Sequence, residues 1–226
     1  MQRGALPHSH EPKQASLLEL RADGDGGKRM KEPFCEKASP KNEKFILDAT
    51  AGFRMMWFNK QHSNAIFMDE RDDNELRLDA EQFGKNRGRP LFKEWNPTNP
   101  TVQGDYRKVN FFNNFRLIIW DPPHLFSSGS KKHQQRLCFG SLHAETWQSD
   151  LTKGFLALWQ QLAPWGILIF KWHDSAISHK DIFKLFDIRP LFGQITTNRK
   201  VKKKNIHTYW FCFMKIPENE KGLVNK

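Results

Sequence analysis

The segment Asp121-Pro122-Pro123-His124 has the chemical groups needed to hold a flat amino group. It follows an apolar run, Leu117 to Trp120, which has the length and composition of a strand. The carboxylate can accept one N–H, and a backbone carbonyl held rigid by the prolines can accept another. The imidazole can lie against a heterocycle. The pattern predicts a site that binds a flat amino group.

Three further apolar runs end in an acid. They are Phe45 to Asp48, Ala65 to Asp69 and Thr101 to Asp105. Because the carboxyl ends of parallel strands meet at one edge of a sheet, we expect these carboxylates to lie close to that of Asp121. So many carboxylates at one edge would repel one another in an empty site. The pattern therefore indicates a ligand with hydroxyl or amino groups, or a cationic ligand.

The rest of the chain alternates between helical and strand patterns. Helices are expected at Phe53 to Lys60, Thr146 to Leu162 and Ser178 to Phe186. Further strands are expected at Ile167 to Trp172, Ile188 to Ile195 and His207 to Met214, the last two joined by a basic hairpin, Asn198 to Asn205. Residues 83–100 form a polar insert rich in Gly and Pro. The alternation predicts an α/β fold with a mostly parallel sheet and helices on both faces.

Composition divides the chain into three parts. Residues 1–43 contain four prolines and the run Gly24 to Gly27, with little apolar periodicity, so we expect a disordered N-terminal extension. Residues 44–216 are expected to form one folded domain, and residues 217–226 a flexible C-terminal tail.

The charge indicates an anionic partner. The chain has 226 residues and a formal net charge of +11, of which residues 1–43 contribute +1 from eight basic and seven acidic side chains. A basic folded domain favours nucleic acid as a partner, although a solvated basic surface that maintains solubility is the alternative. Two basic clusters supply candidate phosphate contacts, which are Lys131, Lys132, Arg136, Lys202, Lys203 and Lys204.

Cysteine usage and hydropathy favour a cytoplasmic protein. Cys35, Cys138 and Cys212 are far apart and lack the spacing of zinc ligands, so we expect reduced thiols and no metal. No apolar run approaches the ~20 residues of a membrane span. The N-terminus also lacks the apolar core of a signal peptide. The sequence leaves the oligomeric state open.

The order of these motifs resembles class I S-adenosylmethionine-dependent methyltransferases. More narrowly, three segments are similar to a small group of bacterial and phage amino-methyltransferases that carry an (Asp/Asn/Ser)-Pro-Pro-aromatic motif. These segments are Asp121 to Leu125, Phe170 to Trp172 and Pro190 to Gly193. The resemblance covers roughly residues 44–215. It implies a Rossmann-like, doubly wound, seven-stranded sheet and S-adenosyl-L-methionine as cofactor.

The resemblance assigns cofactor contacts to the first three strand ends. The implied residues are Asp48, Ala49, Gly52, Asp69, Asp105 and Tyr106. The turn after the first strand would lie against the methionine part of the cofactor, and it has one glycine where the family usually has two or three. Asp69 would bind the ribose hydroxyls, with Glu70 as the alternative. Asp105 would accept the adenine amino group beside the ring of Tyr106.

The resemblance also assigns the chemistry. The implied catalytic residues are Asp121, Pro122, Pro123 and His124. They imply methylation of an exocyclic amino group, adenine N6 or cytosine N4, in DNA or RNA, with a duplex base flipped out of its stack. Two alternatives stay open. One is methylation of a protein glutamine or a small amine, and the other is a catalytically inactive binding or scaffold protein.

Overall fold

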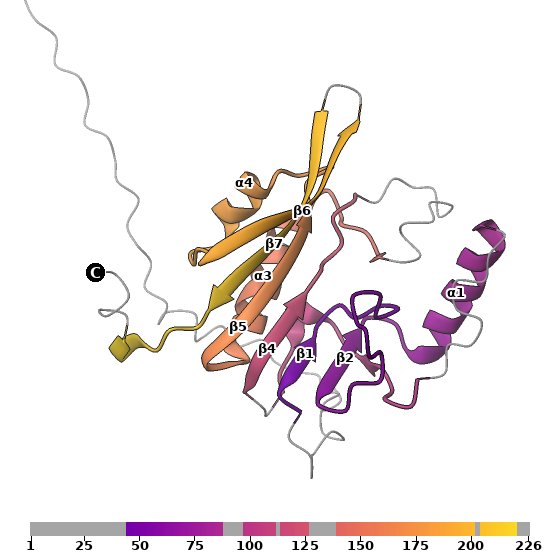
Figure 1. Ribbon diagram of the computed structural model, residues 1–226, viewed down its shortest axis with the longest axis horizontal. Coiled ribbons are helices and arrows are strands. Elements are labelled where there is room, and N and C mark those ends of the chain that lie inside the picture. Colours follow the sequence, from indigo (N-terminus) through magenta and orange to yellow (C-terminus); the bar gives the residue numbers. More distant parts are fainter. Residues whose placement is uncertain (1–43, 88–96, 112–113, 127–138, 202–203, 221–226) are drawn as a thin grey trace, which may run out of the picture. The chain divides into compact units, whose positions relative to one another are not determined.

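The computed structural model describes residues 44–87, 97–111, 114–126, 139–201 and 204–220. Its strands are β1 (Ile46–Asp48), β2 (Ala65–Asp69), β3 (Val102–Gln103), β4 (Phe115–Trp120), β5 (Leu162–His173), β6 (Phe192–Val201) and β7 (Lys204–Met214). They form one seven-stranded sheet in the order β3-β2-β1-β4-β5-β7-β6 (Figure 1). The described helices are α1 (Asp73–Arg87), α3 (Trp147–Gln160) and α4 (His179–Ile182), with 3-10 helices η1 (Tyr106–Lys108), η2 (Phe183–Leu185) and η3 (Glu218–Glu220).

The sheet is mostly parallel. β1 pairs in parallel with β2 and β4, β2 with β3, and β4 with β5. β7 is antiparallel to both β5 and β6. The expected Rossmann-like α/β fold is therefore confirmed. Because β2 and β3 lie on one side of β1 while β4 and β5 lie on the other, strand order reverses between β1 and β4, which is where such sheets bind ligands.

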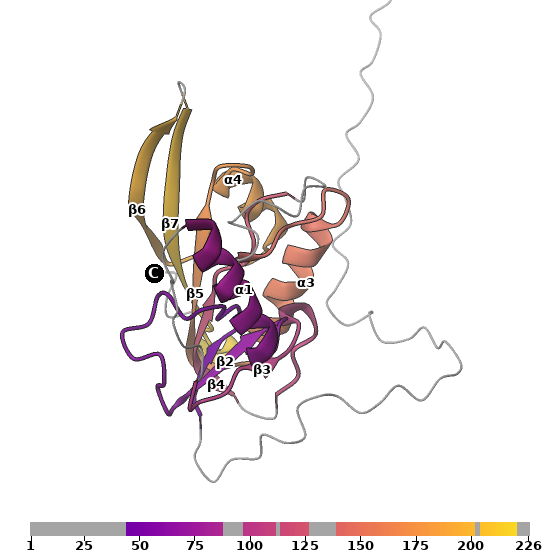
Figure 2. The same ribbon diagram turned by 90° about the vertical axis from the view of Figure 1, so that its right-hand side faces the viewer.

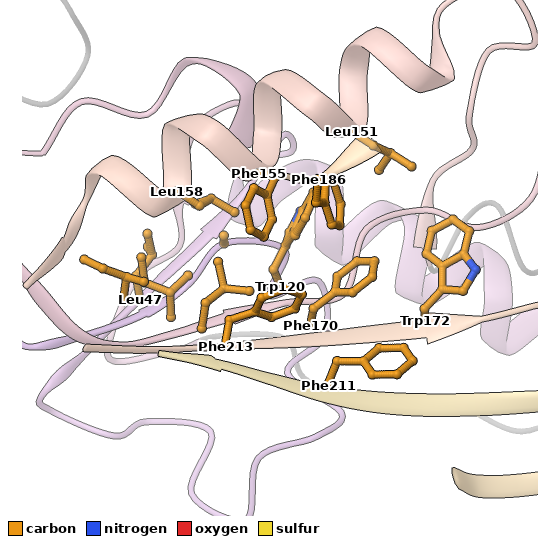
Figure 3. Close-up of a cluster of buried hydrophobic side chains, with 14 of the residues drawn as sticks. Leu47, Trp120, Leu151, Phe155, Leu158, Phe170, Trp172, Phe186, Phe211 and Phe213 are labelled. Carbon is orange, nitrogen blue, oxygen red and sulfur yellow. The ribbon is translucent and has the colours of Figure 1, made fainter. Parts of the chain in front are cut away.

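One face of the sheet packs against α3 and α4 (Figure 2). α3 buries Leu151, Gly154, Phe155 and Leu158, which recur at helical spacing. Figure 3 shows Phe155 and Leu158 pointing towards Trp120 on β4 and Phe170 on β5. In β5 the buried Leu168, Phe170 and Trp172 alternate with half-buried residues, so Lys171 lies on the face opposite α3.

On that opposite face, residues 50–64 cross β1 and β2 as turns, and the expected helix at Phe53 to Lys60 is wrong. Gly52 and Arg54 have φ values of 48° and 52°, which a right-handed helix does not permit. Arg54 is fully buried, donates to the carbonyl of Lys60 at 2.7 Å, and lies 3.9 Å from the ring centroid of Phe67. These tertiary contacts of one arginine hold the turns in place.

α1 was not expected from the sequence. It begins in a capping box, because the backbone N–H groups of Glu75 and Asp72 donate to each other's carboxylates at 2.8 and 3.0 Å. Leu76 and Ala80, one turn apart, are buried. The helix includes the beginning of the expected insert at 83–100, and residues 88–96 lie outside the described residues.

The second half of the chain follows the expectations with shifted boundaries. The long helix is confirmed as α3, and the helix expected at Ser178 to Phe186 is divided between α4 and η2. β6 begins at Phe192 rather than at Ile188. The expected hairpin at Asn198 to Asn205 is mostly paired strand, with Val201 opposite Lys204. Residues 1–43 and 221–226 lie outside the described residues, and η3 occupies the start of the expected C-terminal tail.

Candidate active site at the carboxyl edge of the sheet

A cavity of about 500 Å³ lies at the carboxyl ends of β1 to β4, beside the reversal of strand order. It is lined by residues of the β1 turn, the ends of β2 and β3, the Asp-Pro-Pro segment and the segment after it. These are Ala49 to Phe53, Met55, Met56, Asp69 to Arg71, Asp79, Gly104 to Arg107, Asp121, Pro123, Phe139 to His143, Asp150 and Lys171. The cavity therefore contains most of the residues predicted for cofactor and amine binding.

Asp48 supports the cavity from behind. Its side chain is fully buried and does not line the wall. It accepts hydrogen bonds from Trp57 Nε1 at 2.7 Å and from the Thr50 backbone at 3.3 Å. Burial raises the pKa of Asp48 to about 7, and the nearby charges of Asp121 and Asp69 add to that shift.

The turn after β1 joins two strand ends. Gly52 adopts the left-handed φ of 48° that a glycine accepts without strain, and its N–H donates to Asp69 Oδ2 at 2.9 Å. The hydroxyl of Thr50 accepts the backbone N–H of Asp121 at 2.8 Å. Ala49 and Ala51 are buried and small, so they leave the backbone accessible to the cavity. The single glycine thus occupies the position in this turn where a positive φ is needed.

Asp69, the last residue of β2, and Asp105, which follows β3, are each held by an arginine two residues later. Asp69 Oδ1 accepts from the backbone of Arg71 at 3.1 Å and from its Nε at 2.8 Å. Asp105 Oδ1 accepts from the backbone of Arg107 at 2.9 Å and from its Nε at 2.8 Å. Burial alone would raise the pKa of Asp105, but the hydrogen bonds and charge of Arg107 hold it below its ordinary value.

Each of these arginines also binds an acid on a helix. Arg71 Nη1 donates to Asp79 of α1 at 2.9 Å, and Arg107 Nη1 lies 3.0 Å from Asp150 of α3. Sequence reasoning did not identify these pairs, although the Asp-x-Arg spacing was visible after both strands. Each arginine therefore links a strand end to a helix and neutralises carboxylates of the cavity wall.

The two acids at the end of β2, Asp69 and Glu70, differ in how accessible their carboxylates are to a ligand. Both oxygens of Asp69 accept hydrogen bonds, because Oδ2 receives the Gly52 N–H and Arg71 Nη2 at 3.3 Å. Glu70 is exposed and lines the cavity. A ligand hydroxyl would therefore find an accessible carboxylate at Glu70 more readily than at Asp69.

Tyr106 forms an aromatic part of the wall. Its ring lies against Gly154 of α3, where an added Cβ would be 2.5 Å from the ring carbons, and 5.6 Å from the ring of Trp120. Burial raises the pKa of Tyr106, so its hydroxyl stays protonated at neutral pH. The residue therefore offers an uncharged ring face at the end of β3.

The two oxygens of Asp121 differ in their partners among the described residues. Its Oδ2 lies 2.5 Å from Nζ of Lys171 on β5. Among the described residues, none donates a hydrogen bond to Oδ1. The side chain is 12% exposed, and burial raises its pKa above the ordinary value although the charge of Lys171 opposes the shift.

The rest of the Asp-Pro-Pro-His segment is divided between wall and interior. Pro122 is buried and Pro123 lines the cavity. His124 is not part of the cavity wall, and its ring lies 4.9 Å from that of His173 and 6.4 Å from that of Trp172. Burial, followed by the charges of His173 and Lys171, lowers the pKa of His124 to about 4. The imidazole is therefore neutral at physiological pH.

Most of the predicted phosphate contacts lie outside the described residues. This applies to Lys131, Lys132, Arg136, Lys202 and Lys203, whereas Lys204 is the first residue of β7.

Within the described ranges, no cluster of three or more His, Cys, Asp or Glu side chains could hold a metal. Cys212 is a buried free thiol. No described helix is both long enough and apolar enough to cross a membrane.

Comparison with protein-family models and with curated proteins found no match. Comparison with solved structures found methyltransferases. An rRNA methylase from Streptococcus thermophilus aligns over 78% of this chain and 90% of its own, with a TM-score of 0.41 and 13% identity. N-methyltransferase NodS from Bradyrhizobium japonicum WM9 aligns over 76% and 84%, with a TM-score of 0.44 and 10% identity. NodS in complex with S-adenosyl-l-homocysteine aligns over 74% and 75%, with a TM-score of 0.42 and 10% identity.

Proposed function

We propose that this chain is an S-adenosylmethionine-dependent methyltransferase that acts on an exocyclic amino group, adenine N6 or cytosine N4, of DNA or RNA. The observation that carries the proposal is the position of Asp121. Its carboxylate lines a cavity at the reversal of strand order and keeps one oxygen free of hydrogen bonds from the described residues. That oxygen suits an N–H donor, and the carbonyl of Pro122 follows directly in the chain.

The cavity has the size and the polar groups that the cofactor needs. A volume of about 500 Å³ lies within the usual range for small-ligand sites. Glu70 would accept the ribose hydroxyls, Asp105 and Tyr106 would bind the adenine, and the turn with Ala49 and Gly52 would lie against the methionine part. The bound cofactor would supply a methyl group on a sulfonium.

The residues of this chain would then activate and orient the amine. Asp121 Oδ1 would accept one N–H and the Pro122 carbonyl another, which favours the tetrahedral nitrogen needed for attack. As the N–C bond forms and the S–C bond breaks, the carboxylate would stabilise the positive charge that develops on nitrogen. The proton that nitrogen loses can pass to Asp121 Oδ1. Most of the acceleration would come from holding the amine in line.

Charge supports a nucleic-acid substrate. The chain carries +11 overall, and almost all of this excess lies outside residues 1–43. The first residues of β7, Lys204 to His207, precede its pairing with β5, which begins at Thr208, and they pair with β6 alone (Figure 1). The sequence of this extension is basic from Arg199 to Lys204. Phosphate contacts there would give affinity that falls with salt.

The proposal is tested by giving the full chain labelled S-adenosylmethionine with separate pools of DNA, total RNA and protein. The modified product is identified by mass. We expect N6-methyladenine or N4-methylcytosine with wild type and none with Asp121→Ala, while Asp187→Ala, an exposed acid, behaves as wild type. Label in protein glutamine, or cofactor binding with no label in any pool, would favour an alternative substrate. Absence of cofactor binding by the wild type would overturn the enzyme proposal.

A further inference from the structure

Lys171 lies on the same sheet face as the Asp121 carboxylate. The pairing of β4 with β5 sets Trp120 opposite Phe170, so the next residues, Asp121 and Lys171, are neighbours at the carboxyl edge. Because Phe170 and Trp172 point into the core with α3, Lys171 between them points to the other face. The backbone of two parallel strands therefore determines the meeting of this acid and this base.

The lysine side chain is held from two sides. Its Nζ lies 2.5 Å from Asp121 Oδ2 and 5.8 Å from the ring centroid of Trp210, the residue opposite Lys171 on β7. Its side chain is 23% exposed, and that of Asp121 is 12% exposed. Both residues line the cavity. The ammonium thus has little freedom to leave the carboxylate, and it approaches one oxygen only.

The charged groups around Asp121 determine how the Lys171 ammonium affects its pKa. Asp48 on β1 is buried near Asp121 and keeps its proton up to about pH 7, whereas a protonated His173 on β5 favours the charged form of Asp121. His124 lies beside His173 and Lys171 and stays neutral. Among the described residues that shift the pKa of Asp121, Lys171 opposes the effect of burial most strongly.

We propose that Lys171 is a positioning residue for methyl transfer, which keeps the Asp121 carboxylate ionised and rotated so that Oδ1 faces the incoming amine. The inference rests on the proposed function. By occupying Oδ2, the ammonium fixes the carboxylate plane and leaves a single acceptor for the substrate N–H. It touches neither the amine nor the transferred methyl group, and it acts through Asp121.

Two substitutions separate the charge of Lys171 from its bulk. Lys171→Met keeps the length of the side chain and removes the charge, whereas Lys171→Arg keeps the charge. In Lys171→Met we expect kcat near pH 7 to fall about 10- to 100-fold, with the KM for S-adenosylmethionine changed less than about 3-fold. The acid limb of the kcat profile should move to higher pH by at least about one unit, because an unpaired buried carboxyl holds its proton more tightly. Lys171→Arg should keep the wild-type limb.

A second measurement does not depend on turnover. Carbon-13 NMR of the Asp121 carboxyl, assigned with Asp121→Asn, follows its titration in the full-length wild type and in Lys171→Met. We expect the midpoint to be higher in Lys171→Met. Lys184→Met, which removes the exposed partner of Asp181, is the control and should leave the Asp121 titration unchanged.

The outcomes distinguish the inference from the function on which it rests. An Asp121 titration that is unchanged in Lys171→Met overturns the role of Lys171, whether or not the wild type is active. If the midpoint differs between wild type and Lys171→Met while the wild type has no transferase activity, that result supports the effect of Lys171 on the carboxylate and overturns the proposed reaction. An active Lys171→Met with an unshifted acid limb also overturns the inference.

Discussion

The acids after β2 and β3 differ from the acid after β4 in the origin of their partners. Asp69 and Asp105 each bind an arginine two residues later in the chain, and the same arginine reaches an acid on a helix. Asp121 binds Lys171, 50 residues away on the neighbouring strand. The first arrangement is local and ties strand ends to helices. The second depends on the completed sheet and leaves one carboxylate oxygen without a donor among the residues that the structure describes.

This difference separates the roles of acids that look equivalent in the sequence. An acid whose oxygens are all occupied, as in Asp69, contributes to the shape of the cavity. An acid with a free oxygen and a cation on the other, as in Asp121, is prepared to accept a proton donor. Asp48 represents a third kind, which is buried with no ion pair among the described residues and has a raised pKa.

The largest effect should come from Asp121→Ala. Loss of the acceptor oxygen should lower kcat by about 10²- to 10⁴-fold, because the amine loses both orientation and charge stabilisation. The free energy of unfolding should also fall by about 1–3 kcal/mol, because the Lys171 ammonium, which is mostly buried, loses its carboxylate partner. Rates and denaturant unfolding curves of the variant and of Asp187→Ala test this contrast. An active Asp121→Ala would remove the distinction between Asp121 and the arginine-held acids.

Asp48→Asn should change how stability depends on pH. The folded chain keeps a proton on Asp48 up to about pH 7, whereas the unfolded chain releases it near its ordinary pKa of 3.8. Wild type should therefore lose stability from this group as pH rises between those values, by on the order of 4 kcal/mol. Urea unfolding of both proteins at about pH 4.5 and 7.5 isolates the contribution of Asp48 to the free energy of unfolding. Equal pH dependence in the two proteins would refute the raised pKa.

Arg107→Met should act mainly on stability, by lowering the free energy of unfolding, rather than on the reaction at Asp121. It leaves Asp105 and Asp150 without their cation, and we expect a loss of about 1–2 kcal/mol in the free energy of unfolding. Arg77→Met, which breaks an exposed pair with Glu81, should cost less than about 0.5 kcal/mol. Equal losses in urea unfolding would contradict the structural role of the Asp-x-Arg turn.

The smallest effect should come from Glu70→Gln. We expect the dissociation constant for S-adenosylmethionine to rise about 10-fold, because a hydroxyl loses a charged acceptor, while the free energy of unfolding is unchanged. Calorimetric titration compares this variant with Glu145→Gln, an exposed acid outside the cavity wall. If both bind as tightly as wild type, Glu70 does not bind the ribose.

Strands and helices whose residues interact mainly with near neighbours in the chain could be predicted from the sequence. The run Ala65 to Asp69 forms β2 over the same residues, and the helical spacing around Phe155 forms α3. The capping box of Asp72 and Glu75 was also visible in the sequence and would have predicted α1. The strand-end positions of the acids followed from the same short apolar runs.

Other features depend on contacts between distant residues. The turns after Gly52 are held by Arg54, which reaches Thr101 at 3.0 Å and packs on Phe67, and no local pattern contains those partners. The pairing of Lys171 with Asp121 required the order and register of β4 and β5. For this reason the sequence located the acid of the candidate site but not the cation that accompanies it.

The most direct test of the central claim is a crystal structure of the full chain with S-adenosylhomocysteine and an oligonucleotide that carries an unmethylated target base. The account predicts that the exocyclic nitrogen lies within hydrogen-bond distance of Asp121 Oδ1 and of the Pro122 carbonyl, with Lys171 still on Oδ2. A base bound elsewhere, or an Asp121 carboxylate turned away from the amine, would contradict it.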